Sequence, residues 1–131
     1  MKMSLDNANL SSDKINYINA HGTSTPLGDE IEYNSVKKLF EKSLKKIFMS
    51  STKSSTGHLL GASGAVESIF SILSIRDNII PPTLNLDSPS DGCNEINLVP
   101  KESINQKITY SLSNSFGFGG TNVSLIFKKF E

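Results

Sequence analysis

The same order of a short apolar strand, a polar loop and a helix occurs twice in this chain of 131 residues. Residues 15–20 (INYINA) and residues 47–51 (IFMSS) are short and bounded by polar stretches, which predicts two buried strands. Each strand is followed by a loop that carries a histidine, and each loop by a segment of helical character. Alternating strands and helices predict an α/β fold with helices packed on one sheet.

The two helices differ in how they begin. Asp29 is a plausible N-cap for the first helix, because Glu32 follows at the spacing of a capping box. The second helix is predicted over about residues 60–76, and its opening, residues 61–65, consists of small side chains. Glycine there lowers helix stability by about 1 kcal/mol relative to alanine, so we expect another backbone to approach closely. The apolar face of this second helix is predicted to be Val66, Ile69, Phe70 and Leu73.

The remainder of the chain contains turns and β-type patterns. Residues 83–92 are extended and rich in turn residues, and residues 96–99 are predicted as a short strand. Alternating apolar residues before and after a glycine-rich turn at 115–121 predict an antiparallel hairpin. We therefore expect one domain over residues 1–131, with a mixed sheet and helices packed on it.

Composition excludes several classes of protein. Lys+Arg and Asp+Glu are both 13, so the neutral chain has no broad electrostatic surface for nucleic acid or anionic membrane. No apolar stretch reaches the roughly 18 residues of a membrane span, and the first nine residues do not resemble a signal peptide. The one cysteine excludes an internal disulfide and fits a reducing compartment, so we expect a cytoplasmic protein without nucleic-acid or membrane partners.

His21 and His58 are the only histidines, and each follows a predicted strand. Ligands bind at the carboxyl ends of strands in open α/β sheets, so we expect both side chains at one edge. His58 also precedes the second helix, whose positive dipole end disfavours protonation. A neutral imidazole there can donate a hydrogen bond to a developing oxyanion. The alternative, that either histidine is an ordinary loop residue, stays open at this point.

Lys53 lies five residues before His58 in the same loop and is a candidate cation. Glu67 lies about two turns into the following helix, within reach for an ion pair with Lys53. The alternative is a solvated loop lysine with no partner.

Other kinds of site have weaker support. Two distant histidines, Cys93 and scattered carboxylates do not form a zinc-ligand pattern. Cys93 lies between Asp91 and Glu95, whose charges raise a thiol pKa, so we expect an inert loop thiol. The segment FGFGG at 116–120 precedes a strand rather than a helix, which argues against a phosphate cradle. Its two phenylalanines either line or gate a pocket or fill the core, and both interpretations stay open.

Four stretches, in the same order and spacing, resemble the β-ketoacyl-acyl-carrier-protein synthases, in particular the bacterial type often called synthase II. They are NAHGTSTP at 19–26, STKS at 51–54, TGHLLGA at 56–62 and NSFGFGGTN at 114–122. The resemblance runs from about Leu5 to Lys129. It implies the C-terminal half of a thiolase-like fold, in which two similar α/β halves form five layers.

The resemblance also implies a reaction, the decarboxylative Claisen condensation of malonyl-carrier-protein with an acyl group held on a cysteine. His21 and His58 match the two catalytic histidines, which hydrogen-bond the malonyl thioester carbonyl as it becomes an enolate. Lys53 matches the active-site lysine, and Glu67 matches its acidic partner. The residues implied in substrate binding are Thr23, Thr25, Phe116, Phe118, Gly119 and Gly120. Among these, the two threonines match contacts to the pantetheine arm, and Phe118 matches a gate of the acyl pocket.

The implied partners are an acyl carrier protein, the N-terminal half of the synthase and a second copy in a homodimeric complete enzyme. No cofactor is expected, because phosphopantetheine arrives on the carrier protein. The nucleophilic cysteine of the family lies in the other half, and Cys93 does not match it. We therefore expect no activity from the chain alone, and a sheet that lacks one strand. The alternatives to part of an enzyme are a non-catalytic partner subunit and a degenerate remnant. The complete set of histidines and lysine argues against a non-catalytic partner subunit.

Overall fold

The computed structural model describes residues 1–130 and contains a mixed four-stranded sheet in the order β2-β1-β5-β6. These strands are β1 (Tyr17–Asn19), β2 (Phe48–Ser50), β5 (Tyr110–Phe116) and β6 (Asn122–Lys128). β1 runs parallel to both β2 and β5, and β6 returns antiparallel to β5. The predicted mixed sheet and hairpin are confirmed. A separate antiparallel pair is formed by β3 (Ile79–Ile80) and β4 (Ile104–Asn105).

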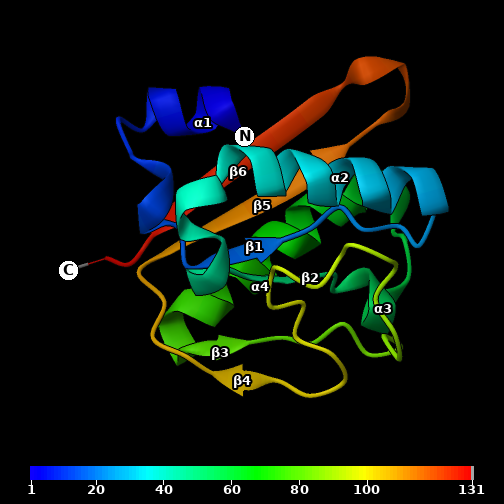
Figure 1. Ribbon diagram of the computed structural model, residues 1–131. Coiled ribbons are helices and arrows are strands. Elements are labelled where there is room, and N and C mark those ends of the chain that lie inside the picture. Colours follow the sequence, from blue (N-terminus) through cyan, green and yellow to red (C-terminus); the bar gives the residue numbers. More distant parts are fainter. Residues whose placement is uncertain (131) are drawn as a thin grey trace.

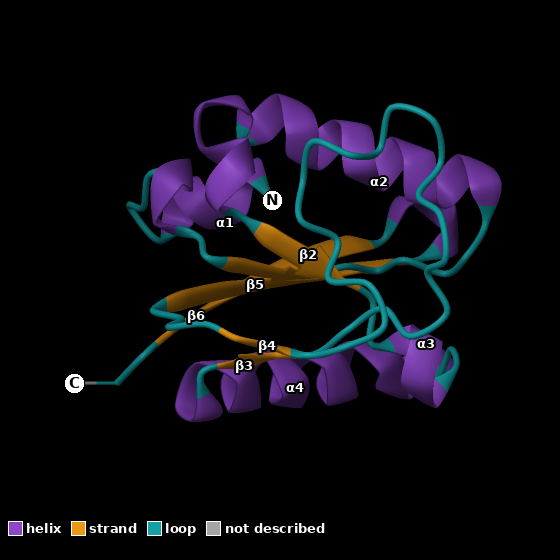
Figure 2. Cartoon of the chain, turned by 60° about the horizontal axis from the view of Figure 1, so that its bottom comes forward, coloured by secondary structure: helices purple, strands orange, loops and turns teal. Residues whose placement is uncertain are grey.

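Helices cover both faces of the sheet and give three layers (Figures 1 and 2). One face carries α1 (Lys2–Asn7) and α2 (Pro26–Leu39), and the other carries α3 (Lys53–Thr56) and α4 (Ser63–Asp77). Short 3₁₀ helices complete the chain: η1 (Ser12–Lys14), η2 (Glu41–Lys46), η3 (Leu60–Ala62) and η4 (Phe118–Gly120).

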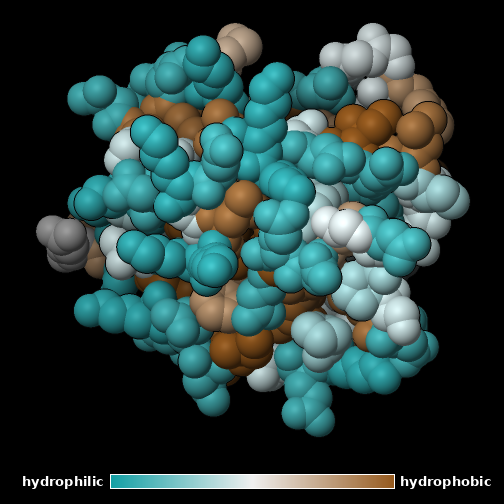
Figure 3. Space-filling model, viewed as in Figure 1, coloured by the Kyte–Doolittle hydropathy of each residue, from teal (hydrophilic) through white to brown (hydrophobic). Residues whose placement is uncertain are grey.

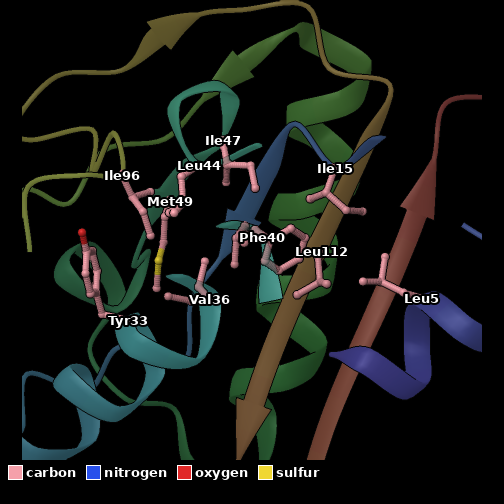
Figure 4. Close-up of a cluster of buried hydrophobic side chains, with 12 residues drawn as sticks. Leu5, Ile15, Tyr33, Val36, Phe40, Leu44, Ile47, Met49, Ile96 and Leu112 are labelled. Carbon is pink, nitrogen blue, oxygen red and sulfur yellow. The ribbon is translucent and has the colours of Figure 1, made fainter. Parts of the chain in front are cut away.

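The larger hydrophobic core lies between the sheet and α2 (Figure 4). Val36 and Phe40 from the end of α2 are completely buried, as is Leu112 from β5. A second cluster contains Tyr17, Ile75, Ile80, Val99 and Ile108, which come from β1, α4, β3 and neighbouring loops. Burying a Leu, Ile or Phe side chain stabilises the fold by about 1.5–3 kcal/mol, so these clusters hold the sheet that positions the loops.

The predicted apolar face of α4 is not the face that the helix buries: Val66, Phe70 and Leu73 are only half-buried, and Ile69 is exposed. The buried residues of α4 are Ser63, Glu67, Ser71, Ser74 and Ile75. Ile69 is 54% exposed and Ile72 is 48% exposed, on the side away from the sheet. The serines are small and donate to helix carbonyls, Ser71 Oγ to Glu67 O at 2.9 Å and Ser74 Oγ to Phe70 O at 2.8 Å. Their hydroxyls are therefore satisfied, which allows a close approach to β5.

Several predicted boundaries also shift. Helix α2 starts at Pro26 with Thr25 as its N-cap, because proline has a helical φ and lacks the N–H that the first turn leaves unpaired. Asp29 is therefore in the first turn and is not the cap. Residues 96–99 form no strand, although Asn97 makes an isolated bridge to Phe48.

Most of the molecular face seen in Figure 3 is hydrophilic. A hydrophobic patch lies at its upper right, where Figure 1 shows the start of α2 and the turn between β5 and β6. The apolar side chains exposed in these two segments are Leu27, Ile31 and Phe118.

Candidate active site

The two histidines lie together, as their places after adjacent parallel strands predicted. The ring centroids of His21 and His58 are 5.5 Å apart and the rings meet edge to face. His21 also lies beside Phe116, with 5.7 Å between the ring centroids. β1 ends just before His21, and β2 leads through α3 to His58, so two neighbouring strands bring both rings to one edge of the sheet.

His58 is held in one orientation by the start of α4. Its Nδ1 accepts the backbone N–H of Leu60 at 3.1 Å and lies 2.9 Å from Ser63 Oγ. A nitrogen that accepts a backbone N–H carries no proton, so the neutral ring has its proton on Nε2. The Nε2–H is then available as a donor to a bound oxyanion.

His21 is held in its neutral form by its surroundings. Burial, the nearby charge of Lys53 and the neighbouring His58 lower the pKa of His21 to about 4. At neutral pH the ring is therefore uncharged and can act as a hydrogen-bond donor through one nitrogen. Its Nδ1 is buried and has no hydrogen-bond partner among the described residues.

Lys53 and Glu67 form the expected ion pair beneath the histidines, and the alternative of a solvated lysine is wrong. Lys53 Nζ donates to Glu67 Oε1, and each side chain is only 4% exposed. Burial raises the pKa of Glu67, while the bond and charge of Lys53 oppose that rise. Since a buried charge is costly without a partner, each of these residues requires the other.

Glu32 has a role that the sequence analysis missed. Its Oε1 accepts the N–H of His21 at 3.0 Å and its Oε2 accepts the N–H of Gly22 at 2.9 Å. Asn114 Nδ2 from β5 adds a third donor at 2.9 Å. The spacing from Asp29 to Glu32 was noticed, but it indicated a capping box, whereas this carboxylate binds the backbone of the histidine loop.

Asp29 lies next to the continuation of the same loop. Burial raises the pKa of its carboxyl group, and the neighbouring backbone of Ser24, Thr25 and Thr23 opposes that rise. Gly22 has φ +32°, and a Cβ there would lie 2.7 Å from Ser51 Cβ, so only glycine fits. Glu32 of α2 thus holds the start of this loop, at His21 and Gly22.

The residues expected to bind substrate lie in two places. Thr23 and Thr25 are joined by a hydroxyl–hydroxyl hydrogen bond of 3.1 Å and lie next to the histidine loop. Phe116 is partly buried beside His21. Phe118, by contrast, is fully exposed on the hairpin turn with Gly119 and Gly120, so it does not fill the core.

Cys93 lies in the loop between β3 and β4 and packs against the core under α2. Burial and the charge of Glu30 raise the pKa of its thiol, which disfavours the reactive thiolate. Within residues 1–130, no group of three His, Cys, Asp or Glu side chains could hold a metal ion. None of the helices in this range is long and apolar enough to cross a membrane.

Comparisons with known proteins agree with this geometry. The model of the family described as "Beta-ketoacyl synthase, C-terminal domain" matches residues 1–87. The 3-oxoacyl-[acyl-carrier-protein] synthase 2 of Rhizobium meliloti is 57% identical over 130 residues, which cover 99% of this chain and 30% of that protein. The chain thus spans about a third of the length of this relative.

Solved structures share the fold. A β-ketoacyl synthase from Burkholderia phymatum matches with a TM-score of 0.93 and 38% identity, over 100% of this chain and 31% of that one. A second match is the ketosynthase from a complex described as a type II PKS acyl-carrier protein with its ketosynthase bound to the hexaketide. Its TM-score is 0.93 and its identity 33%, over 99% of this chain and 32% of that one. The fold is therefore the thiolase-like fold of ketosynthases, and the chain belongs to the β-ketoacyl synthase family, whose C-terminal domain it contains.

Proposed function

We propose that this chain forms the part of a 3-oxoacyl-acyl-carrier-protein synthase that stabilises the enolate of a malonyl thioester. The observation that carries the proposal is the pair of His21 and His58, 5.5 Å apart, next to the buried Lys53–Glu67 pair. Loss of carbon dioxide from the malonyl group leaves an electron pair that delocalises onto the thioester oxygen. Neutral imidazoles that donate hydrogen bonds to that oxygen lower the energy of this charge.

The carbon–carbon bond forms when the resulting carbanion attacks the carbonyl of an acyl group held as a cysteine thioester, and the cysteine thiolate leaves. The only cysteine of this chain does not suit that role, because the pKa of Cys93 is raised by burial and by Glu30. The acyl group is therefore carried by a cysteine in the other half of the synthase. Phosphopantetheine reaches the histidines on the carrier protein, so the site itself needs no cofactor.

The partners of this site are an acyl carrier protein, the N-terminal half of the synthase and a second copy of the complete enzyme, all in the cytoplasm. Thr23 and Thr25, beside the His21 loop, contact the pantetheine arm. Phe116 lines the site next to His21, and Phe118 with Gly119 and Gly120 forms a movable gate to the acyl pocket. The exposed Ile69 and Ile72 of α4 offer an apolar surface for the N-terminal half.

The test is a comparison of half-reactions in a complete synthase that contains this sequence. His21→Ala and His58→Ala should each reduce condensation about 10²–10³-fold, the loss measured for a missing oxyanion donor. Acylation of the cysteine should fall much less, because the enolate is not yet formed. His58→Gln, which retains a side-chain N–H, is the matched variant and should recover part of the rate. An equal fall of both half-reactions would contradict the proposed role.

The purified chain offers a second test. Without an acyl-accepting cysteine near the histidines, it should not elongate acyl-carrier-protein. Turnover above background that disappears in His58→Ala would show that the chain is a complete catalyst and would overturn this part of the proposal.

A further inference from the structure

A cavity of about 150 Å³ lies behind the His21 loop, away from the paired imidazole rings. Its walls are the start of α2, the ends of β1 and β2, and the loop between β3 and β4. Figure 2 shows this loop rising beside β2 and α2. For scale, an engineered cavity of about 150 Å³ holds one benzene molecule.

The walls combine apolar groups with one sign of charge. Tyr33, Met49, Leu86 and Leu98 supply the apolar surface, and Tyr33 and Met49 also belong to the core cluster of Figure 4. The charged residues of the lining are Asp29, Glu30 and Glu32, and no lysine, arginine or histidine lines the cavity. The ionised carboxylates of this lining favour a cationic occupant.

Cys93 also lines the cavity, and its pKa responds to the nearby carboxylate. Its thiol belongs to the lining, and burial together with the charge of Glu30 raises its pKa. Lys37 acts on the thiol in the opposite direction, but Lys37 is paired with Glu95 outside the lining. The carboxylate of Glu30 is exposed and does not hold the histidine loop, so it is free to meet a ligand.

The cavity also adjoins the groups that support His21. Ala20 and Gly22 line it, and Glu32 binds the N–H groups of His21 and Gly22 from the same wall. Ser51, another lining residue, donates through Oγ to Gly22 O at 2.7 Å. An occupant therefore contacts the supports of the histidine loop without touching the imidazole rings.

We propose that this cavity is a binding site for small organic cations, namely a compact apolar ring or chain that carries one ammonium or amidinium group. The apolar part packs against Tyr33, Met49 and Leu98, and the cation faces Glu30. Binding shifts the loop that holds His21 through Gly22 and Glu32. This site is separate from the histidine pair and does not depend on the function proposed above.

The experiment is an NMR titration of the full chain with benzamidine, and with benzoate and benzyl alcohol as probes of similar size. Benzamidine should bind saturably at one site and shift the resonances of Tyr33, Met49 and Cys93. The amide resonances of His21 and Gly22 should shift in the same titration. Benzoate should produce no saturable shift, and benzyl alcohol should bind more weakly than benzamidine.

Two variants decide whether the cavity is responsible. Glu30→Gln should weaken benzamidine binding about fivefold, the loss expected for one solvated charge contact. Glu102→Gln, which changes an exposed carboxylate outside the lining, is the matched control and should leave binding unchanged.

Cys93→Phe fills the cavity and should abolish binding; if that variant fails to fold, Glu30→Gln decides alone. Equal binding of benzoate, no effect of Glu30→Gln, shifts elsewhere or no saturable binding would each overturn the proposal. No arm measures catalysis, so failure here leaves the proposed function standing.

Discussion

Helices α2 and α4 cover opposite faces of one sheet, and they bury opposite kinds of side chain. The end of α2 buries Tyr33, Val36 and the adjoining Phe40, and its one buried charge is Glu32. Helix α4 buries four polar residues and one isoleucine, and it exposes Ile69 and Ile72. The hydrophobic effect therefore attaches α2 to the sheet, whereas α4 is attached by close contact and satisfied polar groups.

The two helices also use their buried glutamates differently. Glu32 of α2 accepts only N–H donors, from the His21 loop and from Asn114. Glu67 of α4 is paired with a cation, Lys53. One carboxylate therefore fixes backbone geometry, and the other balances charge beside the histidines. The difference shows that a helix with a weak apolar contact to its own sheet can still carry a buried ion pair of the site.

The largest expected effect is on the charge pair under α4. Lys53→Met leaves Glu67 buried without a cation, which should lower the free energy of unfolding by about 3–5 kcal/mol. The double variant Lys53→Met/Glu67→Met removes both charges and should recover most of that loss. Urea unfolding of the three proteins measures the difference. A loss below about 1 kcal/mol in the single variant would mean that Glu67 is solvated or protonated and that the pair matters little.

The corresponding change on α2 should be smaller. Glu32→Gln retains one acceptor oxygen but turns an NH₂ group toward a backbone N–H, which leaves a buried donor unpaired. The expected loss is about 1–3 kcal/mol, together with faster hydrogen exchange at the amides of His21 and Gly22. Exchange measured by NMR separates this local effect from global unfolding. Unchanged exchange at both amides would contradict the role given to Glu32.

Truncation of apolar residues tests the two attachments directly. Val36→Ala in α2 removes two buried methyl groups and should cost about 2 kcal/mol of stability. Ile72→Ala in α4 should change stability by no more than about 0.5 kcal/mol, because Ile72 is 48% exposed. Thermal or urea unfolding of the two variants measures both changes in stability. A similar loss in both variants would show that the outer face of α4 is packed in solution.

The last prediction concerns the pH dependence of stability, which screening by solvent at the half-buried His21 keeps small. The pKa of His21 is lowered to about 4 in the folded chain, whereas an unfolded histidine titrates near 6.5. Between these values the unfolded state binds more protons, so the free energy of unfolding falls as the pH falls from about 6.5 to 4. His21→Gln should lose less stability than the parent between pH 7 and 5. An NMR titration that places the folded pKa of His21 near 6.5 would contradict the assigned environment.

Local patterns predicted much of the fold and of the site. The two strand–loop–helix units, the hairpin and the ion pair of Lys53 with Glu67 are present as expected. They could be predicted because strand and helix periodicity are local, and because adjacent parallel strands end at the same edge of a sheet. The meeting of His21 and His58 follows from that rule alone.

The errors occur where neighbours distant in sequence compete for the same side chain. Asp29 and Glu32 have the spacing of a capping box, but Pro26 starts the helix earlier, and the carboxylate of Glu32 binds the histidine loop. The apolar residues of α4 predicted a buried face, but β5 approaches its serines instead. The local pattern predicts neither the partner of Glu32 nor the buried face of α4, because each depends on which backbone packs against the helix.

By itself, then, the sequence determined the α/β class, the four motifs and the edge at which the histidines meet, since these depend on periodicity and chain order. The tertiary structure decided which face of α4 is buried, that Glu32 holds the His21 loop, and that a cavity lined by three acidic residues lies behind it. The physical reason is the same in each case. Burial and hydrogen-bond satisfaction are properties of neighbours in space, and those neighbours come from strands and loops far apart along the chain.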